Sequence, residues 1–191
     1  MKFPASSSVF PFVIALSAAL AAPVFAQTVV PAGSEIAFTS KQMGVPVDGK
    51  FNRFSAQIAF DPKKPETGRV AFSVDLTSVN MGAPESEAEL AKPGWFDSKR
   101  VPAATFQSSA IKAAGPGRFE VTGKLAIKGN VRDVVVPVTL APSGATTTAS
   151  GTFTIKRLAF KIGDGDWGDT SLVADEVQVR FKLALAGLPA S

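Results

Sequence analysis

The sequence predicts an all-β fold of eight antiparallel strands, with one short helical insertion between strands three and four. Runs of alternating apolar and polar residues recur along the chain, and a period of two over such lengths is typical of half-buried strands. Short segments containing Gly or Pro separate these runs, as between successive strands of an antiparallel sheet. Only residues 84–92 have a composition typical of a helix.

The first three strands are predicted at residues 33–41, 45–60 and 68–78. Within the second, apolar residues share one parity up to Phe51 and the other parity from Phe54 onward. A β-bulge near residues 52–53 would produce this switch, and it would let the sheet bend and close. In the third, Val70 and Phe72 begin a clean alternation with polar neighbours.

Residues 84–92 follow, with Glu85 and Glu87 in the expected first turn, where the helix dipole favours acids. The segment ends at Pro93 and Gly94, because proline cannot continue a helix. We expect one or two helical turns that link strands three and four and lead into Trp95 and Phe96.

The remaining strands are predicted at residues 103–114, 118–128, 131–140, 147–158 and 174–186. Residues 115–117 and the pair Gly129-Asn130 suit tight turns between strands four, five and six, and residues 141–147 read as a plain loop. Eight such strands can close into a barrel or stack as a two-sheet sandwich. Periodicity alone does not separate these two architectures, because both present the same apolar face.

Residues 1–26 have the features of a secretory signal peptide. Lys2 precedes an apolar stretch at residues 10–22, and small residues precede an expected cleavage site after Ala26. A retained membrane anchor is the alternative, since the stretch from Val9 is just long enough to span a bilayer. We expect cleavage, a mature domain at residues 27–191, and a periplasmic location.

Composition excludes several kinds of chemistry. The chain of 191 residues contains no His, Cys or Tyr, which removes thiol nucleophiles, Ser-His-Asp triads, disulfides and the usual zinc sites. We therefore expect no metal, no cofactor and no enzymatic activity. The net charge is +4, but the basic residues are scattered, which argues against nucleic acid. A mild positive charge favours transient contact with an anionic membrane surface.

Several stretches together resemble the bacterial YceI-like family over residues 28–186. They are Val47 to Phe54, Trp95-Phe96-Asp97, residues 102–108, residues 123–129, residues 153–157, Trp167-Gly168-Asp169 and residues 175–177. The resemblance implies an eight-stranded antiparallel lipocalin-like barrel, exported from the cytoplasm, with an elongated apolar cavity. It also implies a long amphiphilic ligand, such as a polyisoprenoid, an isoprenoid quinone or a fatty-acid derivative, and no defining catalytic residue.

Residues 92–97 are similar to family members found beside membrane cytochromes of the b type. This similarity favours a quinone-like ligand and a b-type cytochrome as partner.

Eleven residues are candidates for binding the ligand. Most are large apolar side chains on the predicted inner face, where pocket lining and solid core share one parity. Trp95, Phe96 and Trp167 lie in loops, where a large apolar residue needs a separate reason. Arg157 is expected to meet either the ligand's polar end or a nearby acid such as Asp97. The candidates are Phe38, Phe51, Phe72, Trp95, Phe96, Phe106, Leu125, Phe153, Arg157, Trp167 and Phe181.

These observations predict a carrier, store or sequestering protein for a lipid. A barrel with a filled core and a structural or protein-interaction role is the alternative. An enzyme acting through Asp and Lys is the third hypothesis.

Overall fold

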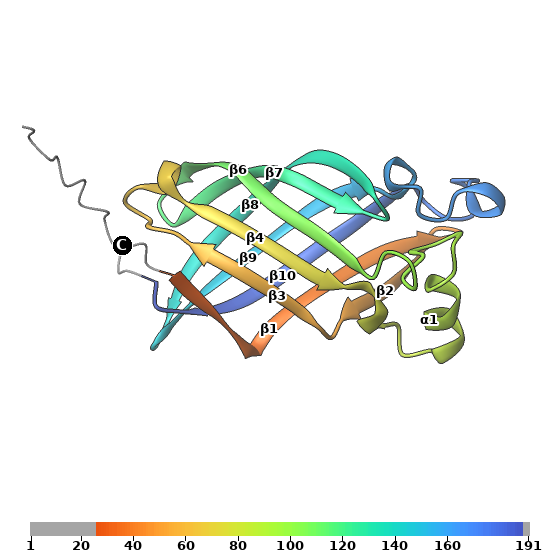
Figure 1. The fold of residues 1–191 in the computed structure, drawn as a ribbon, viewed down its shortest axis with the longest axis horizontal. Helices are drawn as coiled ribbons and strands as arrows, with labels where there is room; N and C mark the ends of the chain where they lie inside the picture. Colours follow the sequence, from red (N-terminus) through yellow and green to blue (C-terminus); the bar gives the residue numbers. More distant parts are fainter. Residues whose placement is uncertain (1–25, 189–191) are drawn as a thin grey trace, which may run out of the picture.

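The alternating runs pair into one antiparallel sheet that closes on itself (Figure 1). In the computed structural model, which describes residues 26–188, ten β-segments make up eight barrel strands, because β2 with β3 and β4 with β5 are two strands, each interrupted once. This confirms the prediction of an eight-stranded antiparallel barrel. The segments are β1 (Ala26–Gln42), β2 (Val45–Phe51), β3 (Phe54–Ala59), β4 (Arg69–Asp75), β5 (Val79–Asn80), β6 (Ala103–Gly115), β7 (Arg118–Ile127), β8 (Asn130–Ser143), β9 (Thr146–Lys156) and β10 (Glu176–Ala186).

Closure depends on β1, which pairs with the last strand on one side and the second barrel strand on the other. Phe38 lies opposite Val179 of β10 and also opposite Gly49 of β2. The ladder with β10 shifts register between Val30 and Glu35, which bends β1 sharply. The order around the barrel is therefore sequential, as expected for hairpin-linked strands.

The interruption between β2 and β3 falls at residues 52–53, where the sequence changes parity. Here the chain bonds to the link between β4 and β5, on the neighbouring strand: the Asn52 N–H donates to Ser78 O at 3.0 Å, and the Arg53 N–H donates to Ser78 Oγ at 2.9 Å. The predicted break in this strand is confirmed, and it turns the apolar face inward on both sides.

Some predicted boundaries are wrong. The tight turn between β7 and β8 is Lys128-Gly129, one residue earlier than expected, because Ile127 pairs with Asn130. Both turn residues have positive φ, of 51° and 74°, as a two-residue turn of type I′ requires. Residues 141–147 are not a plain loop, since they continue the ladder between β8 and β9, and the first strand begins at residue 26 rather than 33.

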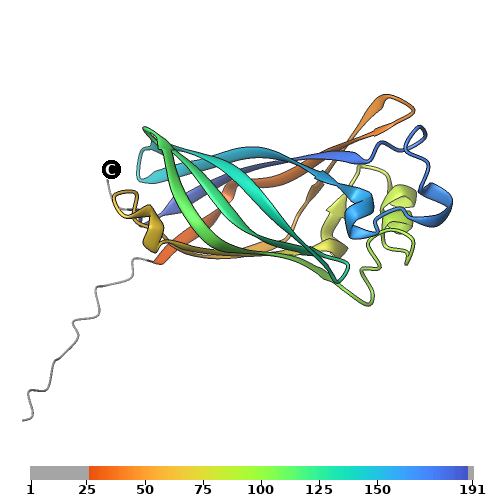
Figure 2. The ribbon, with the colours of Figure 1, turned by 90° about the horizontal axis from the view of Figure 1, so that it is seen from above.

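The two ends of the barrel are built differently (Figures 1 and 2). One end, here called the mouth end, carries α1 (Pro84–Leu90) and the loops that contain η3 (Arg157–Phe160) and η4 (Gly165–Trp167). The helix confirms the predicted insertion between strands three and four, and it ends two residues earlier than expected. The opposite end carries η1 (Pro65–Thr67) and both ends of the described chain, while η2 (Leu76–Ser78) links β4 to β5.

Nearly all of the expected signal peptide, residues 1–25, lies outside the described residues. Within residues 26–188, no helix is long and apolar enough to cross a membrane.

Three strand glycines allow phenylalanine rings to lie flat against the barrel wall. A Cβ atom at Gly49 would come within 2.4 Å of the Phe38 ring, and one at Gly123 within 2.5 Å of the Phe106 ring. At Gly151 it would meet the Phe181 ring at 2.6 Å and the Pro137 carbonyl oxygen at 2.1 Å. Each glycine is thus required by close approach rather than by its φ angle.

Candidate functional site

The half of the barrel away from the mouth encloses a cavity of about 170 Å³, here called the inner cavity. Every residue that lines it is apolar. They are Ile36, Ile58, Phe60, Val70, Phe72, Val74, Phe106, Ile111, Phe119, Val121, Leu125, Val136, Val138, Leu140, Ala149, Phe153, Phe181, Leu183 and Leu185.

Phe60 and Phe119 lie in the core of this half, and their rings meet edge to face, with centroids 5.0 Å apart. Gln27, also buried, holds Phe60 through two side-chain hydrogen bonds to the Phe60 backbone, of 2.8 and 3.2 Å. Such paired polar contacts satisfy the buried amide and fix the chain here.

A second and larger space, of about 440 Å³, lies at the mouth end and is here called the mouth cavity. This volume falls in the range of small-molecule sites. Ile36 and Val74 line both cavities, so the two adjoin. The lining of the mouth cavity comes from seven strands, α1 and three loops, and it includes the polar residues Ser40, Gln42, Glu85, Ser86, Glu89 and Arg157.

All eleven residues singled out in the sequence lie on these linings. Five line the inner cavity: Phe72, Phe106, Leu125, Phe153 and Phe181. Six line the mouth cavity: Phe38, Phe51, Trp95, Phe96, Arg157 and Trp167. Their contact with a ligand stays a prediction.

Several lining residues were missed although their parity indicated them. Ile58, Phe119, Val121 and Leu183 share the inward face with the chosen candidates. Met81 and Glu89 gave no such signal, because their placement depends on how α1 folds over the mouth.

Aromatic side chains from distant segments meet at the mouth. The Phe51 ring lies between Phe38, at a centroid distance of 5.5 Å, and Phe96, at 6.1 Å. Trp95 packs against Trp167 with centroids 5.8 Å apart. Trp95 is only 8% exposed, whereas Trp167 is 43% exposed. These contacts join the loop after α1 to the strand walls and to the loop containing η4.

Arg157 is almost completely buried, with 2% of its surface exposed, and it organises the loop that follows η3. Its Nε donates to Ala174 O, its Nη1 to Ile162 O and Gly163 O, and its Nη2 to Trp167 O and Val173 O, over distances of 2.5 to 3.1 Å. A guanidinium has five N–H donors, so all of them are used. Neither Asp97 nor any other acid of the described residues pairs with it, and that expectation was wrong: Asp97 pairs with Arg100 instead.

Asp175 partly balances the charge of Arg157 without forming an ion pair with it. Burial lowers the pKa of Arg157, and the charge of Asp175 raises it again. Asp175 itself accepts a hydrogen bond from the Leu158 backbone N–H at 3.0 Å. Arg157 is thus a structural cation whose charge and donors are already engaged within the loop.

Trp95, in contrast to Arg157, has a hydrogen-bond donor that is not engaged. Its Nε1–H is buried and has no hydrogen-bond partner among the described residues, where it is the only side-chain atom in that state. An unsatisfied buried donor costs about 1–3 kcal/mol, so such a group calls for an explanation.

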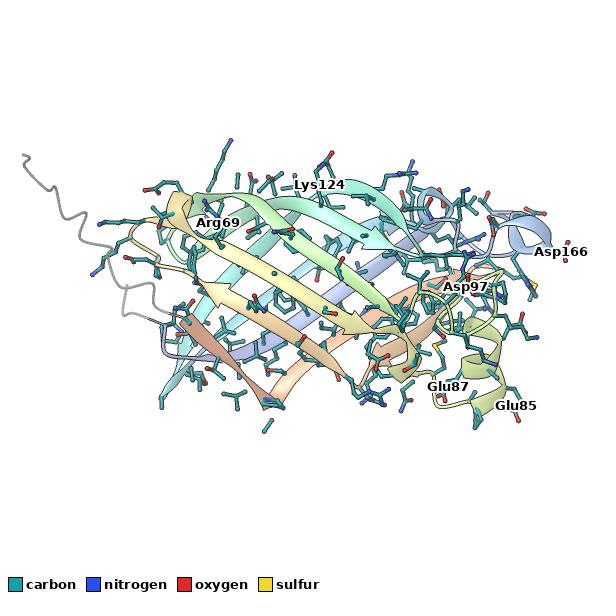
Figure 3. All side chains as sticks on the ribbon, viewed as in Figure 1. Arg69, Glu85, Glu87, Asp97, Lys124 and Asp166 are labelled. Atoms are coloured by element: carbon teal, nitrogen blue, oxygen red, sulfur yellow. The ribbon has the colours of Figure 1, made fainter. Side chains whose placement is uncertain are left out.

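Acidic side chains gather at the mouth end, as Figure 3 shows for Glu85, Glu87, Asp97 and Asp166, whereas Arg69 lies at the opposite end. Glu89 forms an ion pair with Lys92, with the atoms 2.5 Å apart. Glu85 makes no ion pair within the described part of the chain. Within residues 26–188, no three acids lie together as a metal-binding group would require.

A sequence model of the YceI-like domain matches residues 27–185. The chain belongs to the YceI-like family. Among solved structures that the chain resembles, BcnA of Burkholderia cenocepacia is 49% identical, covers 82% of this chain and 98% of its own, and superimposes with a TM-score of 0.79. A YceI-like barrel from Saccharophagus degradans, described as a polyisoprenoid binding domain, is 17% identical, with a TM-score of 0.69 and coverage of 85% and 99%.

A YceI-like relative from Azotobacter vinelandii, a UPF0312 protein, is 30% identical over 88 residues, or 46% of each chain. The chain thus spans about half the length of the first curated relatives that it matches.

Proposed function

We propose that the protein binds one long-chain amphiphile, such as a polyisoprenoid, an isoprenoid quinone or a fatty-acid derivative, for carriage, storage or sequestration. The observation that carries this proposal is the pair of adjoining cavities, the inner one lined only by hydrocarbon. The tail would occupy the inner cavity and the polar end the mouth cavity. The description of the Saccharophagus degradans barrel as polyisoprenoid binding supports the same ligand class.

The driving force would be desolvation of the tail. Each buried methylene contributes about 0.8 kcal/mol, so a few isoprene units give useful affinity without any hydrogen bond. The purely apolar lining of the inner cavity also offers no acid, base or nucleophile to a reaction. We therefore propose binding without catalysis.

Native mass spectrometry of the mature protein, purified from its own periplasm and followed by organic extraction, tests this proposal. We expect one long-chain adduct per chain. If the protein carries no adduct, and also fails to bind added isoprenoid quinones and fatty acids, a filled structural or interaction barrel replaces the carrier.

The periplasmic location is a part of the proposal that rests on residues 1–26. Cell fractionation and N-terminal sequencing test it. We expect periplasmic protein that begins at Gln27; uncleaved protein in the membrane fraction would contradict it.

We also propose that the mouth end touches a membrane transiently to exchange ligand. Met43 and Val45 are exposed at the tip of the β1–β2 hairpin, and the Met43 N–H donates to the carbonyl of the exposed Leu172 at 2.8 Å. The three side chains give this rim an apolar surface. A membrane cytochrome of the b type, as a partner, stays a prediction from the resemblance of residues 92–97.

Co-sedimentation with vesicles of phosphatidylcholine and phosphatidylglycerol tests the contact. The double variant M43S/V45S should bind vesicles less than the native chain. V135S, which removes an apolar side chain that is 54% exposed on the barrel wall, is the control. Equal loss in both variants would contradict a contact through the mouth.

A further inference from the structure

Which polar end of a ligand the mouth cavity accepts depends on the charged side chains of its lining, and the inference drawn from them rests on the proposed function and specifies it further. Glu85 and Glu89 contribute carboxylates from α1, and Arg157 is the one cation of the lining.

Arg157 cannot serve an anionic ligand without breaking the loop. Each of its five N–H groups already donates to a backbone carbonyl between residues 162 and 174. An incoming phosphate or carboxylate would find the guanidinium enclosed by carbonyl oxygens, which repel it at short range.

Two lysines at the mouth end, outside the lining, are also engaged. Lys92 pairs with Glu89 at 2.5 Å. The Lys128 ammonium donates to Lys161 O at 2.6 Å and lies 3.7 Å from an Asp164 carboxylate oxygen. An anionic head group would therefore lose its hydration beside Glu85 without gaining a free cation, and burial of an unpaired charge is strongly unfavourable.

Trp95 offers a ligand in the mouth cavity a hydrogen-bond donor. Its buried Nε1–H, on the lining of the same cavity, is a donor without an acceptor. An indole N–H can only donate, so its partner must be a hydrogen-bond acceptor. Trp167 packs against Trp95 from an exposed loop position, so the two indoles lie together on the lining.

We propose that the mouth cavity selects amphiphiles whose head group is uncharged and carries an acceptor oxygen, such as a carbonyl, which the Trp95 Nε1–H binds. Carboxylate and phosphate head groups are rejected by the Glu85 carboxylate, which makes no ion pair within the described residues.

Three probes with the same isoprenoid skeleton test the proposal: a benzoquinone with a geranylgeranyl chain, geranylgeranyl phosphate, and the hydrocarbon phytane. Affinities are measured by equilibrium binding to the delipidated mature protein. We expect the quinone to bind about tenfold more tightly than phytane, and the phosphate to bind more weakly than phytane.

Two variants test which residues cause these differences in affinity. W95F keeps an aromatic ring but removes the donor, so quinone affinity should fall about three- to tenfold while phytane affinity is unchanged. E85Q should raise phosphate affinity and leave quinone affinity unchanged. D166N, which removes the charge of an exposed carboxylate at the mouth end outside the lining, is the matched control and should change neither.

The outcomes separate the two proposals. If none of the probes binds, the lipid-binding function and this inference both fail. If phytane binds but the phosphate binds as tightly as the quinone, or if W95F weakens quinone and phytane equally, the binding function stands and the selection of neutral head groups is wrong.

Discussion

The inner and mouth cavities lie in one barrel but are held in different ways. The inner cavity is bounded by regular strands, and its shape follows from side-chain parity and from rings such as Phe181 lying over Gly151. The mouth cavity is bounded by strand ends together with α1 and loops, and the loop of residues 157–174 depends on polar contacts from Arg157 to backbone carbonyls. An apolar space therefore needs only the sheet, whereas a polar, selective opening needs buried hydrogen bonds that are costly to break.

The largest effect is expected at Arg157. Arg157→Met keeps the length of the side chain but leaves five carbonyls without their donor, so the free energy of unfolding should fall by about 3–5 kcal/mol. For a domain of this size, Tm should drop by roughly 10 °C. Thermal unfolding followed by circular dichroism measures it. Arg132→Met, at an exposed arginine of β8, should change stability by less than about 0.5 kcal/mol; equal losses would mean that Arg157 is not what holds the mouth.

The next effect concerns the inner cavity alone. Ala149→Phe places a ring in the space proposed for the tail, so phytane affinity should fall about 100-fold through the loss of several buried methylenes. Ala141→Phe puts the same ring on an exposed position and is the control. Unchanged phytane binding in Ala149→Phe would place the tail elsewhere.

A smaller effect is expected at Gly151, over which the Phe181 ring lies. Gly151→Ala brings a methyl group within 2.1 Å of the Pro137 carbonyl oxygen, which is backbone and cannot move freely. Such overpacking costs about 1–3 kcal/mol. Gly94→Ala has open space around it and should be neutral. Urea denaturation compares the two variants, and equal stabilities would show that the Phe181 ring does not need this glycine.

The smallest effect is expected at Asp75, where β4 passes into η2 between the two cavities. Its carboxylate accepts hydrogen bonds from the side chain and backbone N–H of Thr77 and from Arg53, and these lower its pKa below the ordinary value of 3.8. A lowered folded pKa means that the stabilisation is present above the ordinary value of 3.8 and disappears as the pH falls through the lower, folded value.

Asp75→Asn should therefore cost about 0.5–1 kcal/mol at pH 7 and almost nothing near pH 2. Urea titrations at both values measure it. Asp133→Asn, at an exposed carboxylate paired only with Lys124, is the control and should cost less than about 0.5 kcal/mol. A cost for Asp75→Asn that is independent of pH would contradict the assignment.

Sequence patterns predicted the inner half better than the mouth. Period two placed Phe72, Leu125 and Phe181 on the inward face because a strand fixes the direction of each side chain from its neighbours. The barrel itself, rather than a sandwich, came from resemblance, because parity cannot distinguish them.

The contacts at the mouth end could not be predicted from the sequence, because they join residues that are far apart along the chain. Trp95 and Trp167 were found as aromatics in loops, yet nothing in the pattern indicated that they pack together. Arg157 was expected to find an acid, but the loop presents five carbonyls to it instead. Every residue has a backbone carbonyl, so the sequence does not show which carbonyls will bind a buried cation such as Arg157.

The pairing of β1 with β10 also bears on how the chain acquires its structure. Thr28 meets Ala186 across the seam, so the two halves of the final ladder are separated by nearly the whole domain. Contacts of such high sequence separation form slowly, because a long loop must close before they can contribute. Until the last strand arrives, the apolar inner walls stay open to water, where they are prone to aggregation. We therefore expect the barrel to close in a single late step, after its last strand has been synthesised. Until then, the chain should need protection from aggregation.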